Sequence, residues 1–177
     1  MSTFLVLTII GEDRPGLVES LSDTVAAHGG NWLESRMAHL AGRFAGILRV
    51  SVGGGRSELL RRALAAPQSR GLSGVVERGA AKPPAPAARL RLEILGADHP
   101  GIIRDIARAL AERGINVEEL ETESVSAPMS GEMMFRASAE LQAASDFAVE
   151  ELRAKLEELA NDLVIDVTLD AVYQVRR

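Results

Sequence analysis

The sequence contains no cysteine and no apolar run long enough to cross a membrane. Without cysteine, the 177-residue chain can form neither a disulfide bond nor a thiolate metal site. The first residues, Met1 to Phe4, lack the basic start and the small-residue cleavage site of a secretory signal peptide. These absences predict a cytoplasmic protein without membrane contact. With 46% hydrophobic residues, the chain still has enough apolar side chains for well-packed cores.

Charge is distributed unevenly along the chain, whose formal net charge is −5. Residues 1–79 hold nine arginines and seven acidic residues, a net charge of +2. Residues 88–177 hold ten basic and eighteen acidic residues, a net charge of −8. A duplex-binding surface needs a basic stripe and an element that reads a groove. The sequence shows neither, so we expect no direct contact with nucleic acid.

Residues that could catalyse a reaction or hold a cofactor are scarce. The three histidines, His28, His39 and His99, have no metal-ligand spacing, and no serine lies in a recognisable nucleophile turn. The three-glycine run at 53–55 lacks the Lys-Ser/Thr pair of a phosphate-binding loop and favours a flexible connection. The sequence therefore predicts a protein that is not an enzyme and that uses no cofactor and no metal.

One phrase occurs twice, with a constant offset of 85 positions. Both copies contain Asp-x-Pro-Gly and continue to Gly-x-Asn, at 29–31 and at 114–116. Chance does not produce seven matches without a slip, so the chain consists of two copies of one module. The matched pairs are Gly11/Gly96, Asp13/Asp98, Pro15/Pro100, Gly16/Gly101, Gly29/Gly114, Asn31/Asn116 and Glu34/Glu119.

Hydrophobic periodicity gives the same order of elements in each copy. Apolar residues alternate before the phrase, as in a half-buried strand, and recur at helical spacing after it. We expect the proline at the first helical position, and Gly29 and Gly114 as left-handed helix stops. In the first copy the pattern predicts strands at 3–11, 31–40, 43–52 and 72–78 and helices at 15–28 and 57–66. In the second it predicts strands at 89–95, 116–125, 132–141 and 163–170 and helices at 100–113 and 146–160.

The predicted fold class is α+β, with two ferredoxin-like βαββαβ modules. Each would form a four-stranded antiparallel sheet with two helices on one face. We expect the first module at 1–79, a proline- and alanine-rich linker at 80–87, the second module at 88–171 and a short tail at 172–177.

The first strand of the first module is apolar on both faces. Leu5, Leu7 and Ile9 match the inward residues of the second copy, but Phe4 and Val6 are apolar as well, where the second copy has arginine. Two explanations stay open. The outer face is covered by the other module or by another chain, or the strand is simply central and strongly apolar.

The turn after the first strand suits a small zwitterion. The first N–H groups of the following helix point into the loop and carry partial positive charge, which favours a carboxylate. Asp13 and Asp98 lie nearby, and Asn31 and Asn116, which open the next strand, could orient an amide or an amino group. The alternative is structural, with aspartate as a helix cap and asparagine in a turn.

A βαββαβ module with Asp-x-Pro-Gly after its first strand and Gly-x-Asn before its second resembles the ACT domain. Members of this family are small modules that bind amino acids and regulate a partner. The resemblance covers nearly the whole chain, and it implies sites where two modules meet, one supplying the loop and the other the strand. It implies ligand contacts at Asp13, Arg14, Gly16, Leu17, Asn31, Asp98, His99, Gly101, Ile102 and Asn116.

Between its second and third strands, the second copy has six additional residues. The inserted segment contains Ala127, Pro128, Ser130 and Gly131 and is followed by apolar residues and a phenylalanine. This segment resembles that of the glycine cleavage system transcriptional repressors, a family of tandem ACT proteins. That family is understood to act through a DNA-binding activator, with glycine relieving repression. A bare hairpin connection is the ordinary alternative for such a loop.

The resemblance therefore implies a regulator that binds glycine or a similar small amino acid and contacts a transcription factor. Two further functions stay open. The chain could be a regulatory subunit that gives amino-acid feedback control of a metabolic enzyme, or a structural pairing module whose pockets bind nothing. The sequence also leaves open whether two chains pair.

Overall fold

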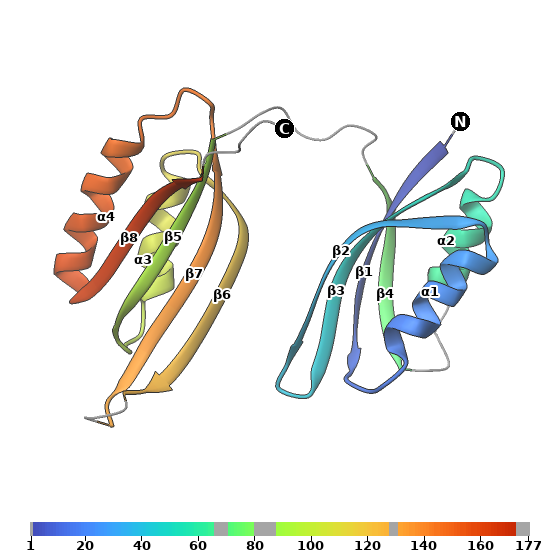
Figure 1. Cartoon of the computed structure of the whole chain (residues 1–177), viewed down its shortest axis with the longest axis horizontal. Helices are drawn as coiled ribbons and strands as arrows, with labels where there is room; N and C mark the ends of the chain where they lie inside the picture. The colour runs from blue at the N-terminus through green and yellow to red at the C-terminus, as the bar shows by residue number, and fades with distance from the viewer. Residues whose placement is uncertain (1, 66–70, 80–87, 128–130, 173–177) are drawn as a thin grey trace. The chain divides into compact units, whose positions relative to one another are not determined.

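The computed structural model describes residues 2–65, 71–79, 88–127 and 131–172 (Figure 1). Backbone contacts divide the chain into two compact units, Met1–Pro84 and Ala85–Arg177. The predicted linker at 80–87 lies outside the described residues. Of the predicted tail, Val172 belongs to the last strand and the rest lies outside the described residues.

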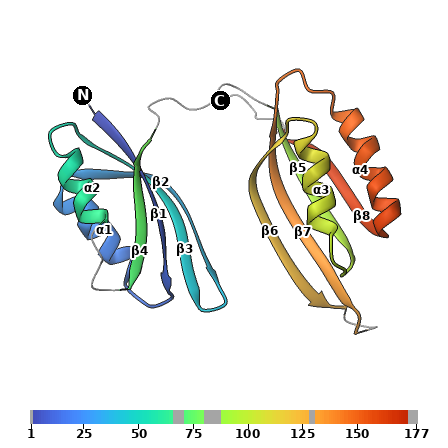
Figure 2. The same cartoon turned by 180° about the vertical axis from the view of Figure 1, so that it is seen from behind.

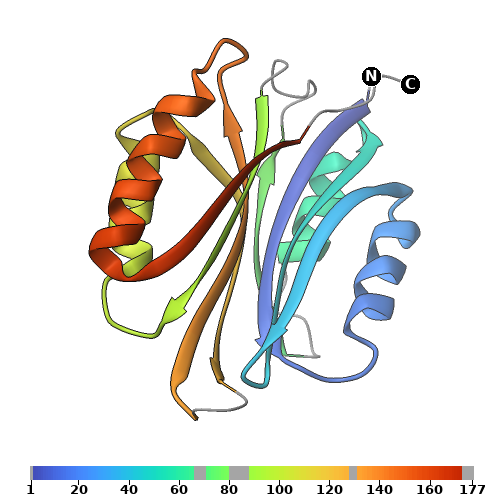
Figure 3. The same cartoon turned by 60° about the vertical axis from the view of Figure 1, so that its left-hand side comes forward.

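Each unit is a four-stranded sheet with two helices on one face, as predicted. The sheet orders are β2-β3-β1-β4 and β6-β7-β5-β8, with antiparallel neighbours throughout. Figures 1 and 2 show α1 and α2 on the same face of the first sheet, and Figure 3 shows α3 and α4 together on the second. The elements of the first unit are β1 (Ser2–Glu12), α1 (Leu17–Ala27), β2 (Gly30–Leu40), β3 (Arg43–Gly53), α2 (Ser57–Ala65) and β4 (Leu72–Arg78). Those of the second are β5 (Ala88–Ala97), α3 (Ile102–Ala111), β6 (Asn116–Ser126), β7 (Met133–Ala143), α4 (Val149–Leu163) and β8 (Ile165–Val172).

The core of each unit lies between the sheet and its helices. Strand residues at every second position point inward, and the helices contribute one apolar stripe each. The buried residues of the first core include Leu5, Leu7, Ile9, Leu17, Leu21, Val25, Leu48, Val50, Leu60 and Leu64. Those of the second include Leu90, Leu92, Ile94, Ile102, Ile106, Leu110, Ala139, Leu141, Leu152 and Leu156.

The register of the two sheets is the same. Gly11 pairs with Phe44 and Gly96 with Phe135, each one pair before the end of its strand pair. A bulge interrupts β2 after Trp32, and the bulge in β6 falls at the equivalent step. Counting from these pairs, positions in β1 and β2 correspond to β5 and β6 with an offset of 85. The offset is 91 from β3 to β7 and 93 from β4 to β8.

The predicted boundaries of three helices are wrong. The first helix of each module begins after the glycine of the Asp-x-Pro-Gly turn, so the proline lies in the turn and not at the first helical position. The last helix was expected at 146–160 but spans Val149–Leu163. Leu163 fits the helical stripe of Leu152 and Leu156 as well as the alternation of the next strand, and the helical packing prevails.

The apolar outer face predicted for the first sheet is present. The side chains of Ile10, Ile47 and Val75 point away from the helices and are 50%, 48% and 62% exposed. The second sheet has charged and hydroxyl side chains at most equivalent positions. The two outer faces therefore differ far more than the two backbones.

Candidate functional site

The turn after the first strand has the same unusual backbone in both modules. Gly16 has φ 86° and Gly101 has φ 108°, in the left-handed region that favours glycine. Helix α1 then begins at Leu17 and α3 at Ile102, and at neither does the residue preceding the helix provide a side-chain cap. The first N–H groups of these helices therefore keep their partial positive charge toward the turn.

The aspartate of each turn contacts the second strand of its sheet and does not cap the helix. Asp98 Oδ2 accepts a hydrogen bond of 2.8 Å from Ser124 Oγ. Asp13 Oδ2 lies 3.7 Å from His39 Nε2. His39 and Ser124 are themselves 85 positions apart, so the same two positions meet in both modules. A capping role for the aspartate, the structural alternative considered above, is not what holds it.

A backbone hydrogen bond ties each turn to a neighbouring hairpin. The N–H of Asp13 donates to the carbonyl of Gly42 at 3.1 Å, and the N–H of Asp98 donates to the carbonyl of Met133 at 2.9 Å. Gly42 and Met133 are equivalent positions. The backbone of each aspartate is thus fixed by the hairpin tip, and in the second module its carboxylate is also fixed by a side chain of the second strand.

The residue after each aspartate lies against the start of the last strand. His99 Nε2 donates a 3.0 Å hydrogen bond to the carbonyl of Leu163. Arg14 lies over Gly71, so close that a side chain added there would lie 3.3 Å from the Arg14 guanidinium. The two positions therefore have similar placement but different chemistry.

A further carboxylate lies in the first turn of each helix. Asp105 forms a bidentate pair with Arg104, with N–O distances of 2.9 and 3.0 Å. This pair holds the pKa of Asp105 below its usual range, so the carboxylate is ionised at neutral pH. Glu19 is the acidic residue of the first turn of α1. Arg104 balances the charge of Asp105, but the carboxylates of Asp105 and Glu19 still offer acceptor oxygens, so a zwitterion can place its ammonium toward them and its carboxylate toward the N–H groups.

The side chains of the other predicted ligand residues do not lie at the turn. Leu17 and Ile102 are only 3% and 2% exposed, because their side chains belong to the cores. Asn31 pairs with Ser51 at the start of β2, about 27 Å along the strand from His39 at 3.4 Å per residue. Within one module, the structure therefore does not bring the asparagine and the aspartate together.

Asn116 has the same placement at the start of β6. It pairs with Gln142 of β7, and its Nδ2 donates a hydrogen bond to Glu118 Oε1. Its partner is thus a neighbour on its own strand, at the opposite end of the sheet from the Asp98 turn.

The inserted segment of the second module begins next to the Asp98 turn. Ala127 N–H donates to the Glu132 carbonyl at 2.8 Å, and Gly131, with φ 73°, donates to the Ala127 carbonyl at 3.0 Å. Pro128 and Ser130 lie outside the described residues. Because Met133 directly follows this segment and accepts the Asp98 hydrogen bond, the loop and the turn form one cluster at the same end of the sheet.

Sequence reasoning missed several residues of these clusters, among them His39, Ser124, Met133 and Leu163. The signal that could have found the first two is the constant offset of 85. His39 and Ser124 obey this offset, but they differ in type, so a comparison of identical residues passes over them. Met133 and Leu163 take part through their backbone carbonyl groups, which every residue type has, so the sequence cannot indicate them.

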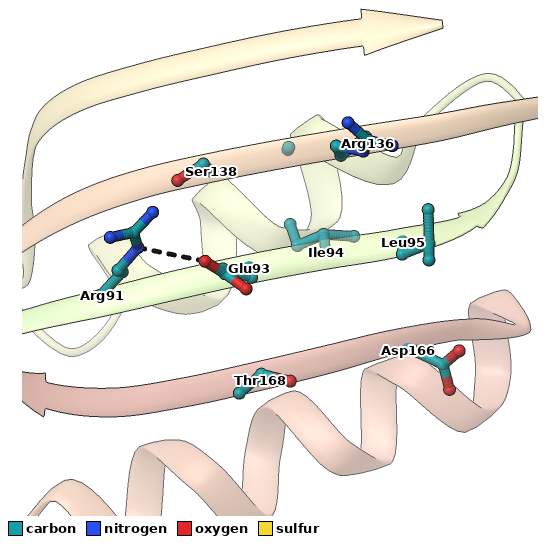
Figure 4. A pocket seen from close by; sticks show the side chains of 9 residues that line it. Arg91, Glu93, Ile94, Leu95, Arg136, Ser138, Asp166 and Thr168 are labelled. Carbon is teal, nitrogen blue, oxygen red and sulfur yellow. Dashed lines mark ion pairs between the residues drawn. The ribbon is translucent and has the colours of Figure 1, made fainter. Parts of the chain in front are cut away.

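Two hollows on the second sheet lie elsewhere, on its outer face. One of about 410 Å³ lies across β5, β7 and β8 (Figure 4). Arg91 pairs with Glu93 at 3.1 Å, and Arg136 pairs with Glu123 at 2.8 Å. Both guanidinium groups already have carboxylate partners, so this hollow offers a ligand little unpaired charge.

Two other classes of site find no support in the part of the chain that the structure describes. There, no three His, Asp or Glu side chains come together in a way that could hold a metal ion. No helix among those residues is long and apolar enough to span a membrane.

Comparisons with known proteins agree with the repeat. Two ACT domain models match the chain, one at residues 3–74 and the other at 90–160. A comparison with functionally curated proteins finds no match.

Two similar solved structures span the whole chain. A protein of unknown function from Galdieria sulphuraria has a TM-score of 0.87 and 28% identity, covering 98% of this chain and 100% of its own. A proposed glycine cleavage system transcriptional repressor has a TM-score of 0.69 and 19% identity, covering 98% and 99%. At that identity the second likeness shows the fold alone. From the two matched domains, the chain belongs to the ACT domain family of regulatory modules and is built from two of them in tandem.

Proposed function

We propose that the chain is an amino-acid-responsive regulator of the glycine cleavage repressor type, which acts through a protein partner. The observation that carries the proposal is the turn cluster, present in both modules. In each, a carboxylate lies against a side chain of the second strand and beside the uncapped N–H groups of a helix, and in the second module it accepts a hydrogen bond from that side chain. Such a cluster offers complementary contacts to both ends of a small amino acid.

The second module has the structural link that regulation would need. Its turn is hydrogen-bonded through Met133 to the hairpin that carries the inserted segment, whereas the first module has only the two-residue turn Ala41-Gly42 there. A ligand that binds the Asp98 turn would favour one arrangement of this loop over others. A coupling of about 1–3 kcal/mol would change the affinity for a partner about 5- to 150-fold.

A protein partner suits this chain better than DNA does. The second module has a net charge of −8 over residues 88–177, and the outer face of its sheet is rich in glutamate and aspartate. Phosphate groups would be repelled from such a surface. A regulator of transcription with these charges would act on a DNA-binding protein and not on the duplex.

Calorimetry on the full chain tests ligand binding, with glycine, serine and alanine as the titrated amino acids. We expect Asp98→Ala to weaken binding at the second module about 10- to 100-fold, since a hydrogen bond to a charged group contributes about 1.5–3 kcal/mol. Asp13→Ala makes the same change in the first module and shows which site is active. Asp146→Ala removes one exposed negative charge before α4 and is the matched control.

Asn116→Ala tests whether the other end of the sheet takes part in binding. A weakened affinity with unchanged thermal stability would include the asparagine among the ligand contacts. If neither Asp98→Ala nor Asp13→Ala changes the affinity of any amino acid, the assigned site is wrong. Capture of binding proteins from the native cell then separates the two regulatory functions, because the partner would be either a DNA-binding protein or a metabolic enzyme.

A further inference from the structure

The outer face of the first sheet carries no helix of its own module (Figure 1). Ile10, Ile47 and Val75 are about half exposed or more, and Phe4 and Val6 are partly buried beside them. Arg49 lies on the same face, where its guanidinium is 4.8 Å from the centroid of the Phe4 ring and pairs with Glu34 at 3.2 Å. The apolar side chains thus form a patch over β1, β3 and β4, and Arg49 lies at its border.

The fold does not require apolar residues at these positions. By register, Ile47 corresponds to Ser138, Val75 to Thr168 and Val6 to Arg91 of the second sheet. The second sheet has the same topology with polar residues there. Because large exposed apolar patches mark interaction surfaces, the difference points to a contact made by the first face and not by the second.

The charges on the two faces decide what each can meet. The outer face of the first sheet has equal numbers of acidic and basic residues: Glu12, Glu34, Glu77, Arg36, Arg43 and Arg49. A neutral face of this kind can pack against a copy of itself without net repulsion. That of the second sheet has seven acidic and three basic residues and would repel its own copy: Glu93, Glu119, Glu121, Glu123, Glu140, Asp166, Asp170, Arg89, Arg91 and Arg136.

The area of the first face is sufficient for a specific dimer. Four strands about 4.8 Å apart and about ten residues long span roughly 600 Å². Two such faces in contact would bury about 1,200 Å², at the lower end of the range for stable protein interfaces. Sheets pack face to face about 10 Å apart, with their side chains interdigitating, and the small residues Thr8 and Ala45 leave room for this at the centre.

We propose that the chain forms a homodimer in which the outer faces of the two first sheets pack against each other. The second copy is the occupant that the apolar character, the charge balance and the area favour together. The proposal is independent of amino-acid binding, since no residue of the turn clusters belongs to this face.

Sedimentation equilibrium of the full chain gives the first test. We expect a mass of twice 18.9 kDa for the unmodified protein. Ile47→Glu should raise the dissociation constant of the dimer at least about 100-fold, because the interface would strip a carboxylate of its water. In the monomer the new carboxylate lies across from Arg36 of β2, so the fold should tolerate it.

The matched control is Ser138→Arg, at the equivalent position of the second sheet. The new guanidinium lies across from Glu121 of β6, so this variant also gains an opposite charge, and it should remain a dimer. Ile47→Ser copies the residue of the second module and tests the interface without a charge. Circular dichroism and thermal melting report whether each variant is folded.

Cross-linking gives an independent readout, because the chain has no cysteine of its own. With a bis-maleimide reagent, Ile47→Cys should form covalent dimers and Ser138→Cys should not. A monomeric unmodified protein would overturn the proposal. So would a dimer that both folded Ile47 variants leave intact, or one that Ser138→Arg dissociates equally.

Discussion

The two modules carry the same backbone irregularities at the same steps, but they differ in the side chains that these steps present. The bulge after Trp32 recurs after Val117, and the left-handed glycine of the first turn recurs with it. Positions that set the path of the chain have been kept. Positions on the outer face, in the turn cluster and under the edge strand have changed. The shared positions are those that the fold requires, and the changed ones are those in which the functions of the two modules can differ.

The space under the edge strand shows this difference most clearly. In the first module, Trp32 of β2 packs against the core and donates a hydrogen bond to Ser35 Oγ at 3.3 Å. In the second, the equivalent Val117 is too small to fill this position. An apolar slot of about 30 Å³ remains there, lined by Leu92, Ile94, Ile103, Ile106, Ala107, Leu110, Val117, Leu120, Ala137 and Ala139.

The largest expected effect concerns a glycine that the two modules share. A side chain on Gly11 would lie 2.5 Å from the carbonyl oxygen of Gly71, and one on Gly96 would lie 2.8 Å from Ile165 Cα. Gly11→Ala and Gly96→Ala should each lower the free energy of unfolding of their own module by about 3 kcal/mol, because backbone must move. Trp32 is the single tryptophan, so its fluorescence follows the first module while circular dichroism follows both.

A weaker effect is expected from exchanging the residues under the edge strand. Trp32→Val should destabilise the first module by about 2 kcal/mol, since it removes a large partly buried side chain. Val117→Trp should stabilise the second by about 1 kcal/mol, because the indole can cover apolar surface that is now exposed. Urea unfolding measures both. A loss of stability in Val117→Trp would show that the slot cannot hold an indole. The two modules would then differ in how the core packs under the edge strand.

Exchanging the residue before the last strand should change the free energy of unfolding less, and in opposite directions in the two modules. Val164 has φ 54°, which is strained for a β-branched residue, and the equivalent Gly71 has φ 77°. Val164→Gly should raise the free energy of unfolding by about 1 kcal/mol, and Gly71→Val should lower it by about the same amount. Thermal unfolding of the two variants, together with the double exchange, checks the sign. Equal destabilisation by both changes would contradict the correspondence.

The smallest expected effect is the pH dependence of the stability that Glu58 gives to the first module. Hydrogen bonds from Arg61 and Arg62 lower the pKa of Glu58 in α2 to about 2, from 4.5. A lowered carboxyl pKa stabilises the fold above pH 4.5, and this contribution is lost as pH falls from 4.5 to 2. The advantage of the unmodified protein over Glu58→Gln should therefore shrink across that window. Trp32 fluorescence during thermal unfolding follows it, and Glu151→Gln on α4 should leave this signal unchanged.

The repeat made the architecture predictable, because two copies of one pattern constrain the strand order more strongly than one. The strand predicted at 72–78 is confirmed by Leu72–Arg78. The start of α1 was not predictable from Pro15, because proline is common both in turns and at the first position of a helix. At Leu163 two periodicities overlap, and only packing against the core of the second module decides between them.

The turn cluster could be predicted only in part. The sequence indicates that Asp13 and Asp98 lie beside a helix start, and the structure places them there. It does not indicate their partners, because His39 and Ser124 lie 26 residues away and are joined to them only by sheet register. The same register separates Asn31 from Asp13, although the two lie closer in the sequence.

The connection between the second and third strands is much shorter in the first module than in the second. Strands β2 and β3 are joined by Ala41-Gly42, whereas β6 and β7 gain one more pair, Ser126 with Met133, and a longer connection. Both lengths leave the sheet register untouched. The two modules therefore show the same sheet with two lengths of this connection, and the tip of the second hairpin is a site where segments can be grafted or removed without rebuilding the domain.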